Sequence, residues 1–258
     1  MVESPGAAGV ITRLRAAGCI FAEEEAEILL TSSESDAELE RFVSRRVAGT
    51  PLEYIVGWAE FRGLRIGVDE GVFVPRRRTE FLVDLCVDGI GPASVVLDLC
   101  CGAGALAAAI VAEVPDADVY AADIDPIAVR CARGNLSADR VLEGDLFAAL
   151  PVSLRDRVEV IVVNAPYVPT TEIAFMPLEA RNFEALVALD GGDDGLHVHR
   201  RVAAEARDWL VPGGVLVIET SEHHAERTRA LFADRGFDAQ VRRDEDRDAT
   251  AVTARAPH

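Results

Sequence analysis

Lysine is missing from this sequence, and all 26 basic residues are arginine. That absence excludes chemistry built on a lysine amine, such as Schiff bases and the phosphate-binding lysine of P-loop proteins. Long apolar runs are missing too, since no stretch approaches the roughly 20 residues that a membrane helix needs. The first residues, MVESPGAAGVITRLRAAG, lack the basic start and apolar core of a signal peptide. We therefore expect a soluble cytoplasmic protein without a membrane partner.

Positive charge is scarce, because 44 acidic residues against 26 basic ones leave a formal net charge of -18. Such a surface repels phosphate backbones and disfavours nucleic acid as a partner. The five cysteines are odd in number and form no CxxC pair, which argues against disulfides and zinc knuckles. His197 and His199 lie two residues apart on a predicted helix and should face different sides. We expect no metal site.

The N-terminal part of the chain has a helical pattern. Apolar residues at three- and four-residue steps predict helices over residues 8–48, the last beginning at a Ser35 or Asp36 cap and stopping at Gly49. These helices either form a plain cap or bind a partner. They constitute a predicted helical domain at residues 1–50.

Two further regions follow the helices. The stretch EFRGLRIGVDEGVFVP alternates apolar and polar residues and carries three glycines, which predicts a β-hairpin linker over residues 51–77. From Val95 onward, predicted strands alternate with helices, which is typical of an α/β fold with a doubly wound, mostly parallel sheet. The last two strands are separated only by a turn and should pair antiparallel. We predict one larger domain at 78–258, with seven strands at SVVLDLC, ADVYAAD, RVLEGD, VEVIVVN, GGVLVIET, FDAQVRR and DATAVTARA.

The first of these strands leads into a loop of small residues and an alanine-rich helix, VVLDLCCGAGALAAAI. Ligands in such folds bind beyond the carboxyl ends of the strands, and Gly102 and Gly104 allow the backbone to approach one closely. The loop differs from the dinucleotide motif GxGxxG, which disfavours a nicotinamide dehydrogenase. Asp98, at the strand end, would repel a pyrophosphate but attract a cationic amino acid.

The next two strands also end in acids. Asp123 follows the glycine loop by about 20 residues, the place of an acid that binds ribose hydroxyls. Asp145, with the Leu146 backbone, could contact the amine and ring of adenine. Three acids at successive strand ends suit adenosine with a positively charged aminoacyl tail, which describes S-adenosylmethionine. The alternative is that the glycines only pack a strand against a helix.

The fourth strand ends in Asn164, Ala165, Pro166 and Tyr167. The Asn164 side-chain oxygen and the Ala165 carbonyl, which Pro166 holds outward, can both accept hydrogen bonds from one flat NH2 group, with Tyr167 over it. An amide nitrogen is a weak nucleophile, and two such acceptors favour its pyramidalisation toward a methyl donor. The rate would come from positioning and electrostatics. The alternative is an ordinary turn.

With these motifs, the chain resembles the bacterial protein-(glutamine-N5) methyltransferases that modify peptide chain release factors. The resemblance rests on the junction at 45–83 with its Pro-Arg-x-x-Thr-Glu element (Pro75, Arg76, Thr79 and Glu80), on LDLCCGAGALA, on ADIDPIAV, on VALDGGDDGL at 187–196 and on LVPGGVLVIET. The chain departs from the family pattern at Ala165, where a proline is usual, at Cys100, where a glycine is usual, at Arg77-Arg78, and in TSEHH after the VIE triplet.

The resemblance implies a class I, Rossmann-like methyltransferase with these site residues. S-adenosylmethionine would be held by Asp98, Cys100, Cys101, Gly102, Ala103, Gly104, Asp123, Asp145, Leu146, Asn164, Arg76 and Thr79. The catalytic residues would be Asn164, Ala165, Pro166 and Tyr167, which bind the glutamine amide of a Gly-Gly-Gln loop. The N-terminal helices would dock the release factor.

Two alternatives remain open at this point. An amino-methyltransferase acting on adenine or guanine of nucleic acid would share the Asn-Ala-Pro-Tyr motif but needs a basic face. Arg76–Arg78 is the one basic run near the site, and we interpret it as a solvated face of the linker. A protein that binds the cofactor without catalysis would not need the motif.

Overall fold

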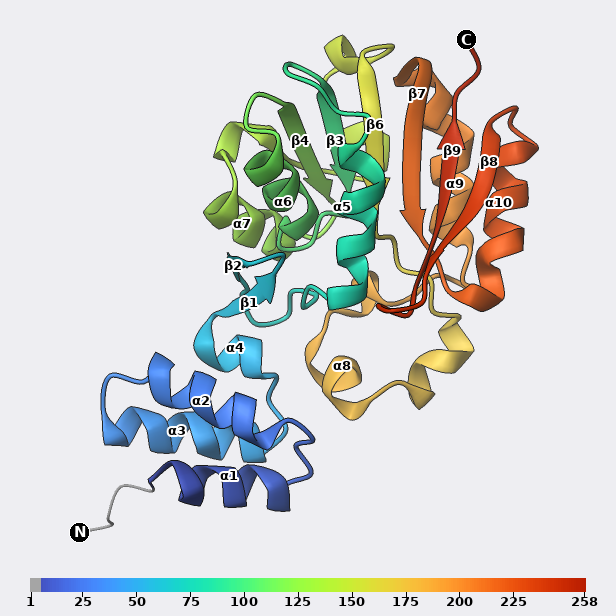
Figure 1. The fold of residues 1–258 in the computed structure, drawn as a ribbon. Coiled ribbons are helices and arrows are strands. Elements are labelled where there is room, and N and C mark those ends of the chain that lie inside the picture. The colour runs from blue at the N-terminus through green and yellow to red at the C-terminus, as the bar shows by residue number, and fades with distance from the viewer. Residues whose placement is uncertain (1–5) are drawn as a thin grey trace.

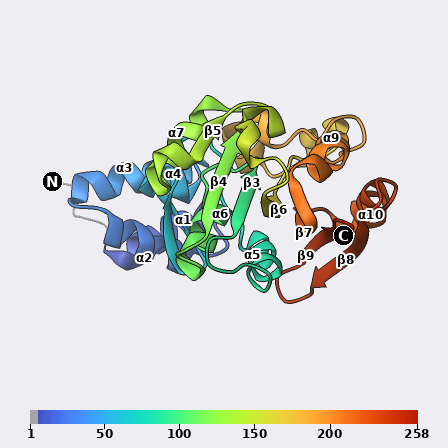
Figure 2. The same cartoon turned by 90° about the horizontal axis from the view of Figure 1, so that it is seen from above.

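The structure is a computed structural model and describes residues 6–258. Residues 1–5 lie outside the described residues. They belong to the predicted 1–50 domain and to the stretch that we compared with a signal peptide. Figure 1 shows a small helical bundle below a larger α/β unit, and Figure 2 shows that bundle at one end of the molecule and α10 at the other. Within residues 6–258, no helix is long and apolar enough to cross a bilayer.

The bundle contains α1 (Ala7–Ala16), α2 (Ala22–Ser32), α3 (Asp36–Val47) and the short α4 (Leu52–Val56). Ser35 rather than Asp36 caps α3, because its side chain accepts the Glu38 N–H at 3.3 Å. The four helices share an apolar core that extends to Ile55 in α4. The predicted helices are confirmed, and the domain boundary at residue 50 stays a prediction.

The linker contains a hairpin of β1 (Trp58–Phe61) and β2 (Leu64–Gly67), paired antiparallel. The hairpin is shorter than expected, because Pro51 precedes a helix that Gly57 ends at φ +80°. Residues 68–76 contain no strand, and Gly71 turns the chain there at φ +88°. A single-turn 3-10 helix (Arg77–Thr79) and α5 (Glu80–Val87), which we did not predict, then lead to the sheet.

The large unit is the predicted seven-stranded sheet, in the order β5-β4-β3-β6-β7-β9-β8. All neighbours are parallel except the pairs of β9 with β7 and with β8, so the expected antiparallel end is confirmed. The strands are β3 (Val95–Leu99), β4 (Asp118–Asp123), β5 (Val141–Glu143), β6 (Val158–Val163), β7 (Leu210–Glu219), β8 (Asp238–Asp244) and β9 (Ala249–Arg255).

Helices cover both faces of the sheet (Figures 1 and 2). One buried cluster joins α5, α6 (Ala105–Glu113), α7 (Pro126–Asn135) and the hairpin to one face. A second cluster joins α9 (His197–Glu205) and α10 (Ala225–Ala233) to the other. Between β6 and α9, the chain forms a 3-10 turn at Thr170–Phe175 and α8 (Leu178–Phe183), in a region for which we predicted no element.

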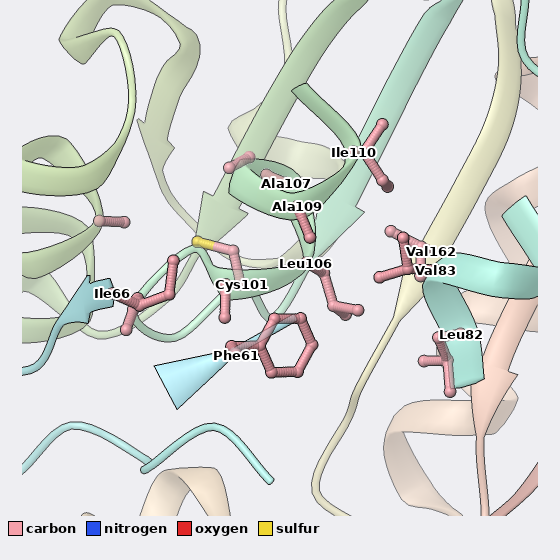
Figure 3. Packing of buried hydrophobic residues seen from close by; sticks show 14 of the residues in the cluster. Phe61, Ile66, Leu82, Val83, Cys101, Leu106, Ala107, Ala109, Ile110 and Val162 are labelled. Atoms are coloured by element: carbon pink, nitrogen blue, oxygen red, sulfur yellow. The ribbon is translucent and has the colours of Figure 1, made fainter. Parts of the chain in front are cut away.

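The hairpin packs directly under the glycine loop. Figure 3 shows Phe61 of β1 beside Leu106 of α6 and Cys101 of the loop, with Ile66 of β2 close by. All four side chains are at most 7% exposed. Their burial joins the linker to the carboxyl ends of the strands, the edge where the predicted site residues gather.

Candidate active site

A cavity of about 560 Å³ lies at the carboxyl ends of β3, β4 and β6. Its walls include most of the residues that we predicted for cofactor and acceptor, namely Thr79, Cys100, Cys101, Gly102, Ala103, Asp123, Asp145, Leu146, Asn164, Ala165, Pro166 and Tyr167. Three predicted residues, Asp98, Gly104 and Arg76, are not part of these walls. The tertiary structure therefore brings the loop after β3 and the turn after β6 to one cavity.

The loop after β3 is shaped by left-handed backbone. Gly102, at φ +55°, has open space where a side chain would begin, so the backbone itself faces the cavity. Gly104, at φ +79°, has the opposite surroundings, because a Cβ there would meet Leu136 Cδ1 at 2.8 Å. Gly104 therefore packs the loop against the chain after α7. Cys100 adopts φ +59°, a conformation that costs a non-glycine residue on the order of 1 kcal/mol.

Asp123 ends β4 and holds this loop in place. One carboxylate oxygen accepts the Gly102 N–H and the other accepts the Asp125 N–H, each at 2.9 Å. Burial raises the pKa of Asp123 above its usual range, which the two backbone N–H donors partly oppose. A carboxylate with fixed direction at the cavity wall suits a pair of ribose hydroxyls.

Asp145 follows β5 and pairs with Arg201 of α9 at 2.8 Å. Arg201 also lines the cavity, as does His197 one turn earlier on the same helix. We did not predict either residue, although their spacing of four on a helix places them on one face. His199 points to the other side, as expected, and its ring contacts Thr228 at 3.1 Å. Leu146, next to Asp145, has φ +49°.

Asp98 lies under the loop rather than in the cavity wall. Its side chain is fully buried, and one oxygen accepts the Ala107 N–H in the first turn of α6 at 3.1 Å. The other oxygen has no hydrogen-bond partner within the described residues. Burial raises the pKa of Asp98 to about 8, because the ionised form is poorly solvated there. Its contact with a cofactor stays a prediction.

The interpretation of Arg76–Arg78 as a solvated face holds for Arg77, is wrong for half-buried Arg76, and is incomplete for Arg78, which is exposed but also faces the cavity. Arg76 forms an ion pair with Glu184, an acid whose side chain is 1% exposed, and does not line the cavity. Arg78 lines the cavity and donates to the Tyr167 hydroxyl at 2.9 Å. Arg77 is exposed. Buried acids from distant segments, which no local pattern reveals, attract these arginines.

The turn after β6 is held by the segment GGDDGL. Val168 pairs with Asp190 in an isolated parallel bridge, and the Gly191 N–H donates to the Val168 carbonyl at 2.8 Å. A Cβ on Gly195 would lie 2.5 Å from the Tyr167 carbonyl oxygen, so only glycine fits. The glycines of this segment therefore allow the close approach that supports the Asn-Ala-Pro-Tyr turn.

Glu219, the last residue of β7, is a site residue that we did not predict. It is 3% exposed and accepts hydrogen bonds from the Thr79 hydroxyl at 2.6 Å and the Tyr167 hydroxyl at 3.2 Å. Asn164 in turn donates its side-chain NH2 to the Thr79 hydroxyl at 3.4 Å. The signal that could have revealed Glu219 is an acid at the end of an apolar strand, as at Asp123.

Three features of the site match the chemistry of S-adenosylmethionine. The open backbone at Gly102 leaves room for a ligand, and Asp123 and Asp145 present carboxylates at neighbouring strand ends. The unpartnered oxygen of Asp98 suits a nearby positive charge. The residues present therefore fit the cofactor.

Comparison with known proteins shows the family to which this chain belongs. Residues 65–180 match the methyltransferase small domain family. A release factor glutamine methyltransferase of Streptomyces coelicolor is 38% identical, over 77% of this chain and 73% of that protein. Another, of Deinococcus radiodurans, is 38% identical over 78% of this chain and 73% of that protein. A solved methyltransferase of Pyrococcus furiosus shares the fold, with a TM-score of 0.58 at 14% identity, over 85% of this chain and all of that one. The chain belongs to the release factor glutamine methyltransferase family.

Proposed function

We propose that this protein transfers a methyl group from S-adenosylmethionine to the side-chain amide nitrogen of a glutamine in a peptide chain release factor. The observation that carries the proposal is that the Gly102 loop and the Asn164–Tyr167 turn line the same cavity. Membership of the family supports the choice of acceptor. The proposal implies a cytoplasmic location, because release factors act in translation.

Each part of the site has a role in this reaction. S-adenosylmethionine, when bound, supplies an electrophilic methyl group on a positively charged sulfur. Cys100–Ala103, Asp123, Asp145 and Leu146 would hold the nucleoside, and Arg201 keeps Asp145 in place. The Asn164 side-chain oxygen and the Ala165 carbonyl accept the two N–H groups of the glutamine amide. Orientation and charge complementarity, rather than a strong base, then lower the barrier.

Labelled methyl donor tests the proposal when the purified protein is incubated with release factor, total RNA or total DNA in separate reactions. We expect label in the release factor, at a glutamine. Asn164→Ala should lower turnover by about 100-fold or more, since it removes one of two acceptors for the reacting amide. Cofactor affinity, measured by calorimetry, should change only a few-fold.

Other outcomes would overturn the proposal in distinct ways. Label in RNA or DNA but not in the release factor would make the protein a nucleic-acid amino-methyltransferase. Equally poor binding of S-adenosylhomocysteine and NAD would remove the cofactor assignment. A large loss of cofactor affinity in Asn164→Ala would mean that Asn164 does not serve the acceptor.

A further inference from the structure

Glu219 lies beside Asn164 because of the sheet register. Strands β6 and β7 are parallel, and Val163 pairs with Ile218. Glu219 is the last residue of β7 and Asn164 directly follows the end of β6, so both lie at the same edge of the sheet. Asn164 lines the cavity, whereas Glu219 is buried behind it and is not among the lining residues. Glu219 can act on a bound amide only through its neighbours.

Those neighbours are all cavity residues. One Glu219 oxygen accepts the Thr79 hydroxyl at 2.6 Å, and the other accepts the Tyr167 hydroxyl at 3.2 Å and Arg78 Nε at 3.3 Å. Thr79 follows the linker, whereas Tyr167 lies in the turn after β6. A single buried carboxylate thus joins both.

The directions of these hydrogen bonds determine the orientation of the Asn164 side-chain amide. The Thr79 hydroxyl has a single proton, which it donates to a Glu219 oxygen at 2.6 Å. The Thr79 oxygen can then only accept, and its second neighbour, Asn164, presents the NH2 end of its amide at 3.4 Å. The reverse orientation of Asn164 would set two acceptor oxygens against each other. The Asn164 oxygen is therefore directed away from Thr79.

We propose that Glu219 is a positioning residue that, through Thr79, fixes which end of the Asn164 amide meets the acceptor. This inference rests on the proposed function, in which the Asn164 oxygen must accept an N–H of the glutamine amide. An Asn164 amide in the opposite orientation would present its own NH2 to the NH2 of glutamine, a repulsive contact. Glu219 thereby ensures that the site binds an amide NH2 rather than an acceptor group.

Three variants test the proposal in the full-length protein with release factor and S-adenosylmethionine. Thr79→Val keeps the shape but removes the hydroxyl, and should lower kcat on the order of 10- to 100-fold. Cofactor KM should change little, because the Thr79 hydroxyl bonds to Glu219 and Asn164 rather than making the cofactor contact that the resemblance implied. Thr79→Ser keeps the hydroxyl and should restore kcat to within about threefold of the natural protein. Glu219→Gln should lower kcat like Thr79→Val, because its amide can also donate and so no longer commits the Thr79 proton.

The double variant and a matched control separate positioning from stability. Thr79→Val with Glu219→Gln should be no slower than the slower single variant, because both interrupt one chain of hydrogen bonds. Glu184→Gln neutralises another buried acid that pairs with an arginine. It should lower the melting temperature without the loss in kcat.

Two results would overturn the positioning role of Glu219. Normal kcat in folded Thr79→Val overturns the positioning role even if Glu219→Gln fails to fold. Equal losses in Thr79→Val and Thr79→Ser would also overturn it, since the hydroxyl would then be irrelevant. If the natural protein itself does not label the release factor, the proposed function fails, which is distinct from a failure of the Glu219 inference.

Discussion

Asp98 makes cofactor binding sensitive to pH if it serves the cationic end of S-adenosylmethionine. Burial raises the pKa of its carboxyl group from 3.8 to about 8. Below that value the folded protein holds the neutral acid, and a cation favours the ionised form. We expect cofactor affinity to rise between about pH 6 and 8, by up to about tenfold per pH unit. Calorimetric titration at several pH values measures this rise.

Asp98→Asn is the matched variant, because the amide oxygen can still accept the Ala107 N–H. Its cofactor affinity should be lower and almost independent of pH over the same range. The same pKa has a consequence for stability. Since the unfolded chain ionises Asp98 at lower pH than the folded chain, its contribution is largest below about pH 4 and declines as the pH rises to 8. An equal pH slope of affinity in both proteins would exclude Asp98 from cofactor binding.

At the scale of elements, the activity depends on how closely the GGDDGL segment approaches the turn after β6. Gly195 has φ +72°, and a Cβ there would meet the Tyr167 carbonyl oxygen at 2.5 Å. Gly195→Ala must therefore displace the catalytic turn. We expect a lower melting temperature and a loss in kcat of about tenfold or more, measured in the methyl-transfer assay.

Gly63→Ala is the control for Gly195→Ala. Gly63 has nearly the same backbone, φ +74°, but in the described part of the chain nothing lies within 4 Å of an added Cβ. The Gly63→Ala substitution should lower the free energy of unfolding by about 1 kcal/mol, because alanine is strained in a left-handed backbone, and it should leave kcat unchanged. If Gly195→Ala behaved in the same way as Gly63→Ala, the close packing would not support catalysis.

At the scale of the whole molecule, Arg46 of α3 connects the N-terminal bundle to the chain beyond the catalytic turn. Arg46 pairs with Glu25 of α2 at 2.6 Å and with Glu179 of α8 at 3.0 Å. The predicted docking role of the bundle requires a fixed position relative to the cavity. Glu179→Gln should therefore raise KM for the release factor several-fold, while it changes cofactor affinity little and stability by about 1 kcal/mol or less.

The exposed pair of Arg45 with Glu70 provides the control. Glu70→Gln removes the same charge near the same helix without affecting the contact with α8, and KM for the release factor should not change. Steady-state kinetics with intact release factor measures both. Equal KM values for the two variants would mean that the Arg46 contact does not orient the bundle.

The sequence by itself determined the elements and the identity of the chemistry. Apolar residues with period 2 or 3.6 predicted the seven strands and most helices, because each element must bury one side. The backbone shape of the loop follows from Gly102 and Gly104, and the acids at strand ends are local features of the chain. The order of the motifs along the chain, from Asp98 to Tyr167, was therefore enough to indicate a methyltransferase.

The tertiary structure alone decided the connections between those motifs. Thr79 and Glu219 are 140 residues apart, and Asp145 and Arg201 are 56 apart, so no local pattern indicates that they meet. Asp98 looks like a ligand contact in the sequence, yet the packing of α6 on β3 buries it beneath the loop. Periodicity reports which side of an element is buried, whereas hydrogen-bond partners depend on which elements pack together. For this reason the elements could be predicted from the sequence, whereas the contacts between them required the tertiary structure.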